Sequence, residues 1–254
     1  MDRRNFMKAT GVLALGTLVS CKTESEVKEP ELEVYELQIH TLSEKGNLLK
    51  DYLRDAYIPA MNRMGAQVGV FSSFKNEEDD RLWIVTVFKN MDHYLKCKHG
   101  IWDDEVYRAD AQGFFDQTCT GTASKATEIY LMESISPDYR FIAPGADKSL
   151  KELRIYRSPN VEGNKRKVEM FRDDEAQIFT DTDMGVAFYG KVLSGPITPT
   201  LIYMPSFVDE EVRDAKWGEF RPKYKLISGL EKYLNNMERV VSNDYLRSLE
   251  FSQF

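Results

Sequence analysis

The sequence predicts an α+β fold in which one β-α-β-β-α-β unit occurs twice in tandem. Two stretches of alternating side chains, 35–40 and 151–156, open the two copies at an offset of 116 residues. A helical stretch follows each of them and runs into a Met-Gly pair that ends at Gly65 or Gly185. Glycine at this point supplies the left-handed backbone conformation that ends many helices. The matching order of strands and helices therefore indicates an internal repeat.

The remaining elements follow in the same order in both copies. Apolar residues of the first helical stretch recur at intervals of three and four, as on the buried face of an amphipathic helix. The expected elements of the first copy are a helix at 45–64, strands at 67–74 and 82–88, an acidic helix start at 90–92 and a closing strand at 127–133. Those of the second copy are a helix at 164–181, strands at 186–193 and 201–207, an acidic helix start at 209–211 and a closing strand at 245–251. Pro205 inside a strand pattern predicts an edge strand or a bulge.

This order of elements is that of the ferredoxin-like unit, so we expect two ferredoxin-like repeats. The stretch between them contains Pro137, Pro144 and Gly145 and is interpreted as a linker. The predicted division of the chain is a signal peptide at 1–20, a flexible tether at 21–32, a first repeat at 33–134, a linker at 135–149 and a second repeat at 150–254.

The first twenty residues have the features of an export signal. Arg3 and Arg4 precede Phe6 and Lys8, and a weakly apolar run follows at 11–20. That run is too short to cross a bilayer, which needs about 20 apolar residues. A charged start with a short apolar core is typical of a signal peptide. The paired arginines resemble the twin-arginine export signal, with general secretory export as the alternative.

Leu18-Val19-Ser20-Cys21 resembles the lipobox of bacterial lipoproteins. This resemblance implies cleavage before Cys21 and acylation of its thiol and new amine. Acyl chains anchor a protein because burying each CH₂ contributes about 0.8 kcal/mol. We therefore expect an exported protein that is lipid-anchored in a bacterial envelope, facing the periplasm or lying on the cell surface. The alternative is an ordinary secretory signal with a chance cysteine.

The charge of the chain excludes one class of partner. At 254 residues the chain suffices for one large domain or two ordinary ones, and its formal net charge is −7. Such a surface repels nucleic-acid phosphates, and the sequence contains no basic stripe to offset this. We expect no nucleic-acid partner, and contact with a membrane only through the lipid anchor. Whether the protein forms a homo-oligomer is left open.

The cysteines and histidines do not predict a metal site or a cofactor. No two cysteines form a CxxC pair, and there is no HExxH motif. His93 and His99 are six residues apart, which does not place them on one face of a helix.

Once Cys21 carries lipid, Cys97 and Cys119 are the one pair of cysteines left that could form an intramolecular disulfide. We favour two separate thiols over a disulfide, because these residues flank a helical region without turns.

Several segments from Glu33 onward resemble the NIPSNAP family. They are YELQIHTL at 35–42, YIPAMNRMG at 57–65, ELRIY at 152–156, KVEMF at 167–171, YMPSF at 203–207 and the tail 245–254. The resemblance implies a dimeric α/β-barrel fold, in which two ferredoxin-like sheets close an eight-stranded barrel with helices outside. Two repeats in one chain are expected to close such a barrel intramolecularly. The resemblance carries over no catalytic residues.

Alternation along the first strand separates its side chains into two faces. Glu36, Gln38 and His40 lie on one face, and Leu37 and Ile39 lie on the other. The strand at 151–156 has the same alternation. We expect the apolar faces to pack on the helices and the polar faces to point into the barrel. The candidate pocket residues are therefore Glu36, Gln38, His40, Glu152, Arg154 and Tyr156.

Charges buried together in this way need partners, so we expect Arg154 to pair with a glutamate. Two interpretations of the polar residues stay open, an internally satisfied polar core and a functional pocket. A carboxylate beside a histidine is also usual material for general acid–base chemistry. A third idea, haem binding by His40, has no flanking sequence pattern to support it.

The function predicted from these features is a binding or interaction module at the cell envelope. Its partner would be a small apolar or aromatic ligand or another envelope protein. The alternative is a cofactor-free enzyme, similar to a monooxygenase or isomerase, with its pocket between the two sheets. Fold analogy supplies most of the support for this alternative, and a fold does not determine a function.

Overall fold

A computed structural model describes residues 31–136, 138, 140–227 and 239–254; the predicted signal peptide and Cys21 lie outside this part. The first half contains β1 (Val34–Leu42), α1 (Gly46–Tyr52), η1 (Leu53–Tyr57), α2 (Ile58–Arg63), β2 (Gln67–Ser73), β3 (Arg81–Phe88), α3 (Met91–Gly100), η2 (Ile101–Asp103), α4 (Glu105–Thr118) and β4 (Ser124–Ser134). The second contains β5 (Leu150–Arg157), α5 (Val161–Met170), η3 (Phe171–Glu175), α6 (Ala176–Asp181), β6 (Val186–Ser194), β7 (Thr200–Phe207), α7 (Glu210–Tyr224) and β8 (Arg239–Ser248).

Capping side chains determine where the longer helices begin. Asn90, Asp104, Asn160 and Asp209 each accept a hydrogen bond from the backbone N–H three residues further on. Such caps satisfy an N–H that has no partner within the helix. The first long helix of each half differs from the expected regular pattern, because a π-helical turn, η1 or η3, interrupts it. Periodicity does not reveal one extra residue per turn, so these two segments could not be expected from the sequence.

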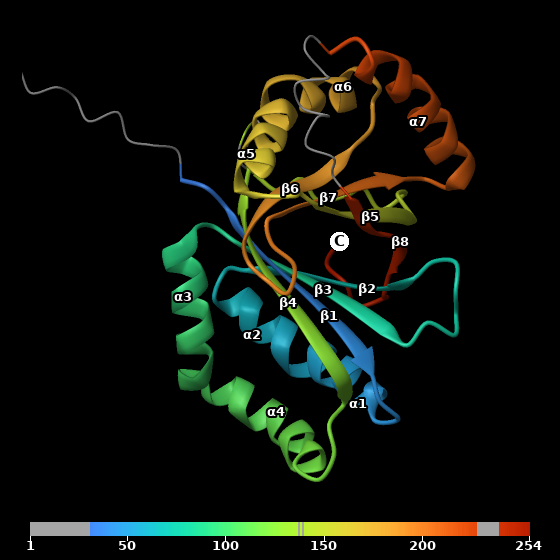
Figure 1. The fold of residues 1–254 in the computed structure, drawn as a ribbon. Helices are drawn as coiled ribbons and strands as arrows, with labels where there is room; N and C mark the ends of the chain where they lie inside the picture. Colours follow the sequence, from blue (N-terminus) through green and yellow to red (C-terminus); the bar gives the residue numbers. More distant parts are fainter. Residues whose placement is uncertain (1–30, 137, 139, 228–238) are drawn as a thin grey trace, which may run out of the picture.

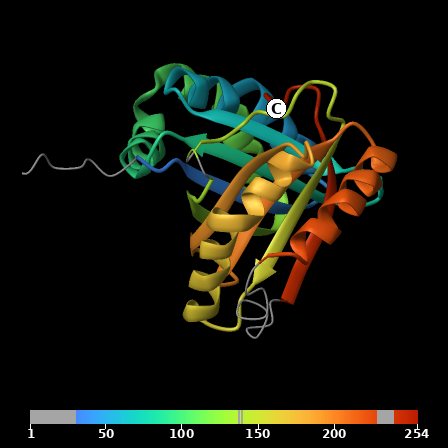
Figure 2. The ribbon, with the colours of Figure 1, turned by 90° about the horizontal axis from the view of Figure 1, so that it is seen from above.

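The eight strands form a closed antiparallel barrel in the order β1-β3-β2-β8-β5-β7-β6-β4. The expected closure within one chain is therefore confirmed. The first four strands form one side of the barrel and the last four form the other (Figure 1). Helices α1–α4 cover the outside of the first set, and α5–α7 cover the second. Figure 2 shows the two groups of helices on separate sides of the barrel.

Apolar side chains from all eight strands fill the interior of the barrel. Leu37 and Ile39 of β1 and Leu153 and Ile155 of β5 belong to this interior cluster. The largest side chains buried with them are Tyr35, Phe71, Trp83, Tyr130 and Phe188. The space between the two sheets is thus a packed core.

The expected orientation of the strand faces is therefore wrong, and the pocket is not between the two sheets. Glu36, Gln38, His40, Glu152, Arg154 and Tyr156 all point outward, beneath the helices. Alternation shows which residues share a face, but here both faces are covered, one by the barrel and one by helices. A charge in the apolar interior would lack a partner, whereas helix side chains can reach an outward one.

Two further apolar clusters lie between the strands and the helices. In the first half, Leu53 and Met61 pack against Val68 and Ile84 of the sheet. In the second half, Phe171 and Phe179 pack against Tyr203, and Trp217 joins them from α7. Each half therefore has its own outer core, while the two halves share the inner one.

One closure of the barrel depends on a segment that follows the last strand. Strands β2 and β8 pair over three residues only, Phe71–Ser73. Along the rest of β2, the N–H groups of Val68 and Val70 donate to the side chains of Gln253 and Ser252. The ring of Phe254 packs on Phe71 in the interior cluster. The segment 249–254 thus completes the seam where the strand ladder is short.

Three smaller expectations have outcomes in the structure. Pro205 lies in β7, which pairs on both sides, so the edge strand was wrong; the register of β6 and β7 shifts beside it, as at a bulge. Cys97 and Cys119 are both free thiols, as expected, and Cys97 is buried. Among the described residues, none of the helices is long and apolar enough to cross a membrane.

The close packing of Phe254 on Gly69 gives a test of the seam. A Cβ atom at residue 69 would collide with the Phe254 ring, so Gly69→Ala should lower the free energy of unfolding by roughly 1–3 kcal/mol. Gly113→Ala is the matched control, because a Cβ there meets nothing and alanine favours the helix by about 1 kcal/mol. Urea denaturation measures both variants. Equal stability of Gly69→Ala and the parent protein would show that the seam does not need this contact.

Candidate functional site

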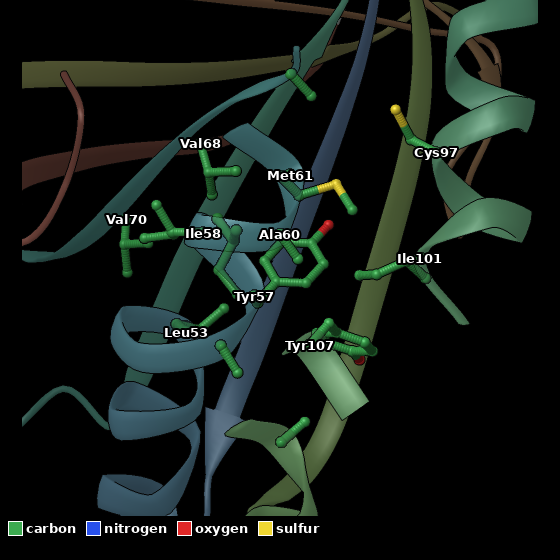
Figure 3. Close-up of a cluster of buried hydrophobic side chains, with 14 of the residues drawn as sticks. Leu53, Tyr57, Ile58, Ala60, Met61, Val68, Val70, Cys97, Ile101 and Tyr107 are labelled. Atoms are coloured by element: carbon green, nitrogen blue, oxygen red, sulfur yellow. The ribbon is translucent and has the colours of Figure 1, made fainter. Parts of the chain in front are cut away.

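The outward polar residues of β1 border a cavity of about 540 Å³, which we call the first-half cavity. Gln38 and His40 line it from the strand, and Lys98 of α3 lines it from the helix layer. Tyr57 of η1 and Tyr107 of α4 reach it from two other sides. Figure 3 shows the Tyr57 ring between α2 and the helices α3 and α4, facing Ile101 and Tyr107. The volume lies in the range of small-molecule pockets.

A continuous chain of hydrogen bonds crosses the polar wall of this cavity. The carboxylate oxygen Oε1 of Glu36 accepts from Lys98 Nζ at 3.0 Å and from Gln38 Nε2 at 2.6 Å. The amide oxygen of Gln38 lies 2.9 Å from His40 Nε2. The other ring nitrogen of His40, Nδ1, lies 2.9 Å from Ser124 Oγ. The buried Glu36 and His40 therefore have partners, as buried polar groups require.

This chain determines the tautomer of His40. Gln38 donates its N–H to Glu36, so its oxygen is an acceptor and receives the proton on Nε2 of His40. Nδ1 is then unprotonated and accepts from the hydroxyl of Ser124, or from that of Thr127 at 3.1 Å. Burial lowers the pKa of His40 below its ordinary value, which favours the same neutral ring. A neutral imidazole thus lies at the edge of the cavity, with its lone pair engaged by the Ser124 or Thr127 hydroxyl.

The phenol of Tyr57 is a second polar feature of the first-half cavity. Tyr57 is the last residue of the π-helical turn η1, and it is 8% exposed. Its hydroxyl is buried and makes no hydrogen bond of ordinary geometry among the described residues, and neither does that of Thr86 on β3. The Thr86 hydroxyl nevertheless acts to lower the pKa of Tyr57, so the two hydroxyls are neighbours. A buried hydroxyl without a partner costs roughly 1–3 kcal/mol. Burial raises the pKa of Tyr57, so the phenol keeps its proton and can donate it.

Aromatic rings form the apolar walls of the first-half cavity. Tyr52 stacks on Phe114 with ring centroids 4.4 Å apart, and its hydroxyl bonds that of Tyr107 at 2.8 Å. Trp102 packs edge-on against Tyr107 at 5.7 Å. Such walls bury an apolar ligand while a few polar groups orient it.

The candidate residues of β5 lie beneath the helices of the second half, beside a separate cavity of about 460 Å³, the second-half cavity. Glu152 is fully buried and its oxygens accept from Arg154, Arg213 and the indole N–H of Trp217. Burial alone would raise the pKa of Glu152, but the hydrogen bonds from Arg213 and the charge of Arg154 hold it below its usual value. Arg154 also bonds the hydroxyl of Tyr156.

The two cavities occupy equivalent places in the two halves. The elements around them align in order, and five residues lining one cavity have a counterpart lining the other. The pairs are Gln38 and Arg154, His40 and Tyr156, Tyr57 and Glu175, Ile84 and Tyr203, and Lys98 and Trp217. Both π-helical turns end at a cavity residue, and π-helical turns are frequent at functional sites. One architecture thus carries two different sets of polar groups.

The six candidate residues predicted from sequence therefore divide into two groups of three and do not share one interior. Sequence reasoning missed Tyr57, Lys98, Arg213 and Trp217 as cavity residues. Trp217 and Lys98 lie at matching steps of α7 and α3, each eight residues after the capping residue of its helix. Counting from the two acidic helix starts could have paired them. No sequence signal marks Tyr57, because the π-helical turn that orients it is not visible in the pattern.

Comparison with known proteins supports the fold. No family model matches the chain, and no curated protein matches its sequence. A candidate monooxygenase from Fusobacterium nucleatum aligns with a TM-score of 0.54 at 9% identity, over 87% of this chain and 94% of that one. A candidate monooxygenase from Lactobacillus acidophilus aligns with a TM-score of 0.53 at 10% identity, over 86% and 94%. At such identities the likeness shows an α/β-barrel fold alone.

A NIPSNAP domain protein from Burkholderia xenovorans is also similar, over 44% of this chain and 95% of its own. The identity is 10% and the TM-score is 0.30. A score this low carries no argument about family. The α/β barrel is therefore established, and the NIPSNAP resemblance rests on the sequence segments alone.

The neutral state of His40 predicts a pH dependence of stability. Its pKa is lower in the folded protein than the value of 6.5 expected for an exposed histidine, so the unfolded chain binds the proton first. The contribution of His40 to the free energy of unfolding should be fully present above about pH 6.5. It should fall as the pH drops toward the pKa of His40 in the folded protein, by about 1.4 kcal/mol for each pH unit between the unfolded-state and folded-state pKa values. Thermal unfolding between pH 5 and 8 measures this. His40→Gln should flatten the profile, and the exposed His99→Gln should leave it unchanged; identical profiles for both variants would contradict the assignment.

Proposed function

We propose that the protein is a small-molecule-binding protein whose first-half cavity takes a neutral, largely apolar ligand carrying a hydrogen-bonding oxygen. The observation that carries this proposal is a cavity with aromatic walls that ends on the buried phenol of Tyr57. The Tyr57 hydroxyl makes no hydrogen bond of ordinary geometry among the described residues and has Thr86 as its neighbour, so a ligand oxygen that displaced the side chains covering it would accept its proton and remove the cost of a weakly paired hydroxyl. A phenol, an alcohol or a ketone has the required chemistry.

The charges around the first-half cavity support a neutral ligand. Lys98, which lines it, is paired with the buried carboxylate of Glu36 at 3.0 Å. This pair has no net charge, and His40 is neutral. A charged ligand would therefore lack a compensating group here, and desolvating it would be costly. The aromatic rings Tyr52, Phe114 and Trp102 suit a flat apolar body.

The enzyme alternative keeps one supporting observation. The unprotonated Nδ1 of His40 accepts from the hydroxyls of Ser124 or Thr127, which line the cavity, so a proton from a bound molecule can reach this neutral imidazole through one of those hydroxyls. The candidate monooxygenases of similar fold make such chemistry reasonable on this scaffold, although a shared fold does not supply the reaction. The pocket of such an enzyme would be the first-half cavity and not the packed barrel interior.

We further propose that each half is a ferredoxin-like repeat, that the protein is an exported member of the NIPSNAP family, and that it is lipid-anchored in the bacterial envelope. The β-α-β-β-α-β order of both halves supports the repeats. The sequence segments from Glu33 onward support the family. The proposed location in the envelope is supported by the predicted signal peptide and by the lipobox-like run from Leu18 to Cys21.

Mass spectrometry of molecules extracted from natively purified protein tests the ligand directly. We expect a neutral molecule with at least one hydroxyl or carbonyl group. Tyr57→Phe, which removes one oxygen and keeps the ring, should weaken rebinding of that molecule about fivefold to tenfold, because one hydrogen bond contributes about 1 kcal/mol. Tyr189→Phe, a buried tyrosine of the second half, is the matched control and should bind normally.

The outcomes separate the proposals. Retention of a ligand with equal affinity in Tyr57→Phe and the parent protein would remove the first-half cavity as the site. If the parent protein converts the captured molecule, and His40→Gln binds it without converting it, the enzyme alternative replaces simple binding.

Acylation of Cys21 predicts how the protein divides between detergent and water. The mature protein expressed in a bacterial host should enter the detergent phase of a phase-separated Triton X-114 extract, because acyl chains transfer there. Cys21→Ala should move it to the aqueous phase. Cys119→Ala, which changes an exposed thiol, should leave it in the detergent. A Cys21→Ala protein that stays in the detergent would show that the anchor is elsewhere.

A further inference from the structure

The charged groups beside the second-half cavity are not balanced as they are in the first. In the first half, Lys98 and Glu36 cancel each other. In the second half, two arginines, Arg154 and Arg213, share one buried carboxylate, that of Glu152. The arginine side chains are only 16% and 15% exposed, so the excess positive charge lies beneath the helix layer.

The other charged groups near the second-half cavity do not cancel this excess. Lys167 and Glu175 pair with each other, at 10% and 5% exposure. Asp214 bonds Arg213 but is 71% exposed, so water screens its charge. Arg221 and Lys225 add positive charge at the exposed rim. Among the described residues, the balance around the cavity is therefore positive.

Arg154 has donors left for a ligand. A guanidinium carries five N–H groups. Within the described part of the chain, Arg154 makes three hydrogen bonds, two to the Tyr156 hydroxyl and one to Glu152. Its guanidinium carbon also lies 4.6 Å from the centre of the Trp217 ring and 5.8 Å from that of Tyr203. These rings hold the guanidinium in place, and they are walls of the cavity.

We propose that the second-half cavity binds a small aromatic carboxylate, a ligand class distinct from the neutral one assigned to the first-half cavity. The carboxylate would accept the remaining N–H groups of Arg154, which match its planar geometry. The aromatic body would pack among Tyr156, Tyr203 and Phe220. A volume of about 460 Å³ accommodates a two-ring molecule. The net charge of −7 gives no general attraction for anions, so binding would depend on this local excess.

Isothermal titration of the full-length protein with 2-naphthoate tests the proposal, and 2-naphthamide is the neutral probe of the same shape. The parent protein should bind naphthoate at least about tenfold more tightly than the amide, because charge-assisted hydrogen bonds are roughly twice as strong as neutral ones. Equal affinity for the two probes, or no binding of naphthoate up to millimolar concentration, would overturn the proposal. Because 2-naphthamide is also a neutral ligand of the class proposed for the first-half cavity, the same comparison in Tyr57→Phe protein separates binding there from binding in the second-half cavity.

Arg154→Gln locates the site, because it introduces the residue type that Gln38 supplies at the equivalent position of the first half. Naphthoate affinity should fall about tenfold or more, with no change for the amide. Arg54→Gln removes the same charge from an exposed position in the first half and should leave both affinities within about twofold. Unchanged naphthoate binding in Arg154→Gln would overturn the assignment. A loss caused by Tyr57→Phe instead would place the anionic probe in the first-half cavity, which overturns the assignment and also contradicts the neutral ligand proposed for that cavity, whereas unchanged binding in both variants overturns the second-half assignment alone.

Discussion

The closed barrel with a dry apolar interior is the constraint on which the rest of this structure depends. All eight strands contribute to that interior, and aromatic and branched side chains fill it. Most polar side chains of the strands therefore point outward, where a helix layer covers them; Asp244 and Ser242 of β8 lie on the inward face, and Asp244 is paired there with Arg81. The polar side chains that border the two cavities therefore lie in the layers between the barrel and the helices, and not in the barrel interior. The two halves hold different polar groups in these layers, although they bury similar apolar ones in the centre.

The two buried glutamates that face outward each receive a partner from a helix. Lys98 of α3 reaches Glu36 in the first half, and Arg213 and Trp217 of α7 reach Glu152 in the second. The two glutamates hold equivalent positions, yet their partners differ in number and charge. One cavity is thereby close to neutral and the other is positive. The position of a carboxylate in the fold thus does not determine the charge of the cavity beside it; the number of cationic side chains that reach it does.

Much of the fold could be predicted from the sequence, because repetition and alternation survive as patterns. The strands and the helix starts follow from these patterns, whereas the closed barrel was expected from the NIPSNAP resemblance. The orientation of the polar faces could not, since Glu36 and Leu37 are both buried and alternation does not distinguish interior from helix layer. The partners Lys98 and Arg213 are far away in sequence from the glutamates that they neutralise. The π-helical turn that ends at Tyr57 contains one extra residue, and helix propensity does not predict where such a turn occurs.

The division between a shared interior and separate outer layers has an evolutionary consequence. A substitution in the barrel interior meets side chains from both halves, so a change of size on one side must be matched on the other. Side chains beneath α3 or α7 mostly meet their own half, although Phe74 of the first half also packs on the outer core of the second. Gln38 bonds Glu36 and His40, and Arg154 bonds Glu152 and Tyr156, so either residue can change without contact to the other cavity. A single chain of this design can acquire a second specificity without losing its first, because the barrel that joins the two cavities also isolates them from each other's mutations.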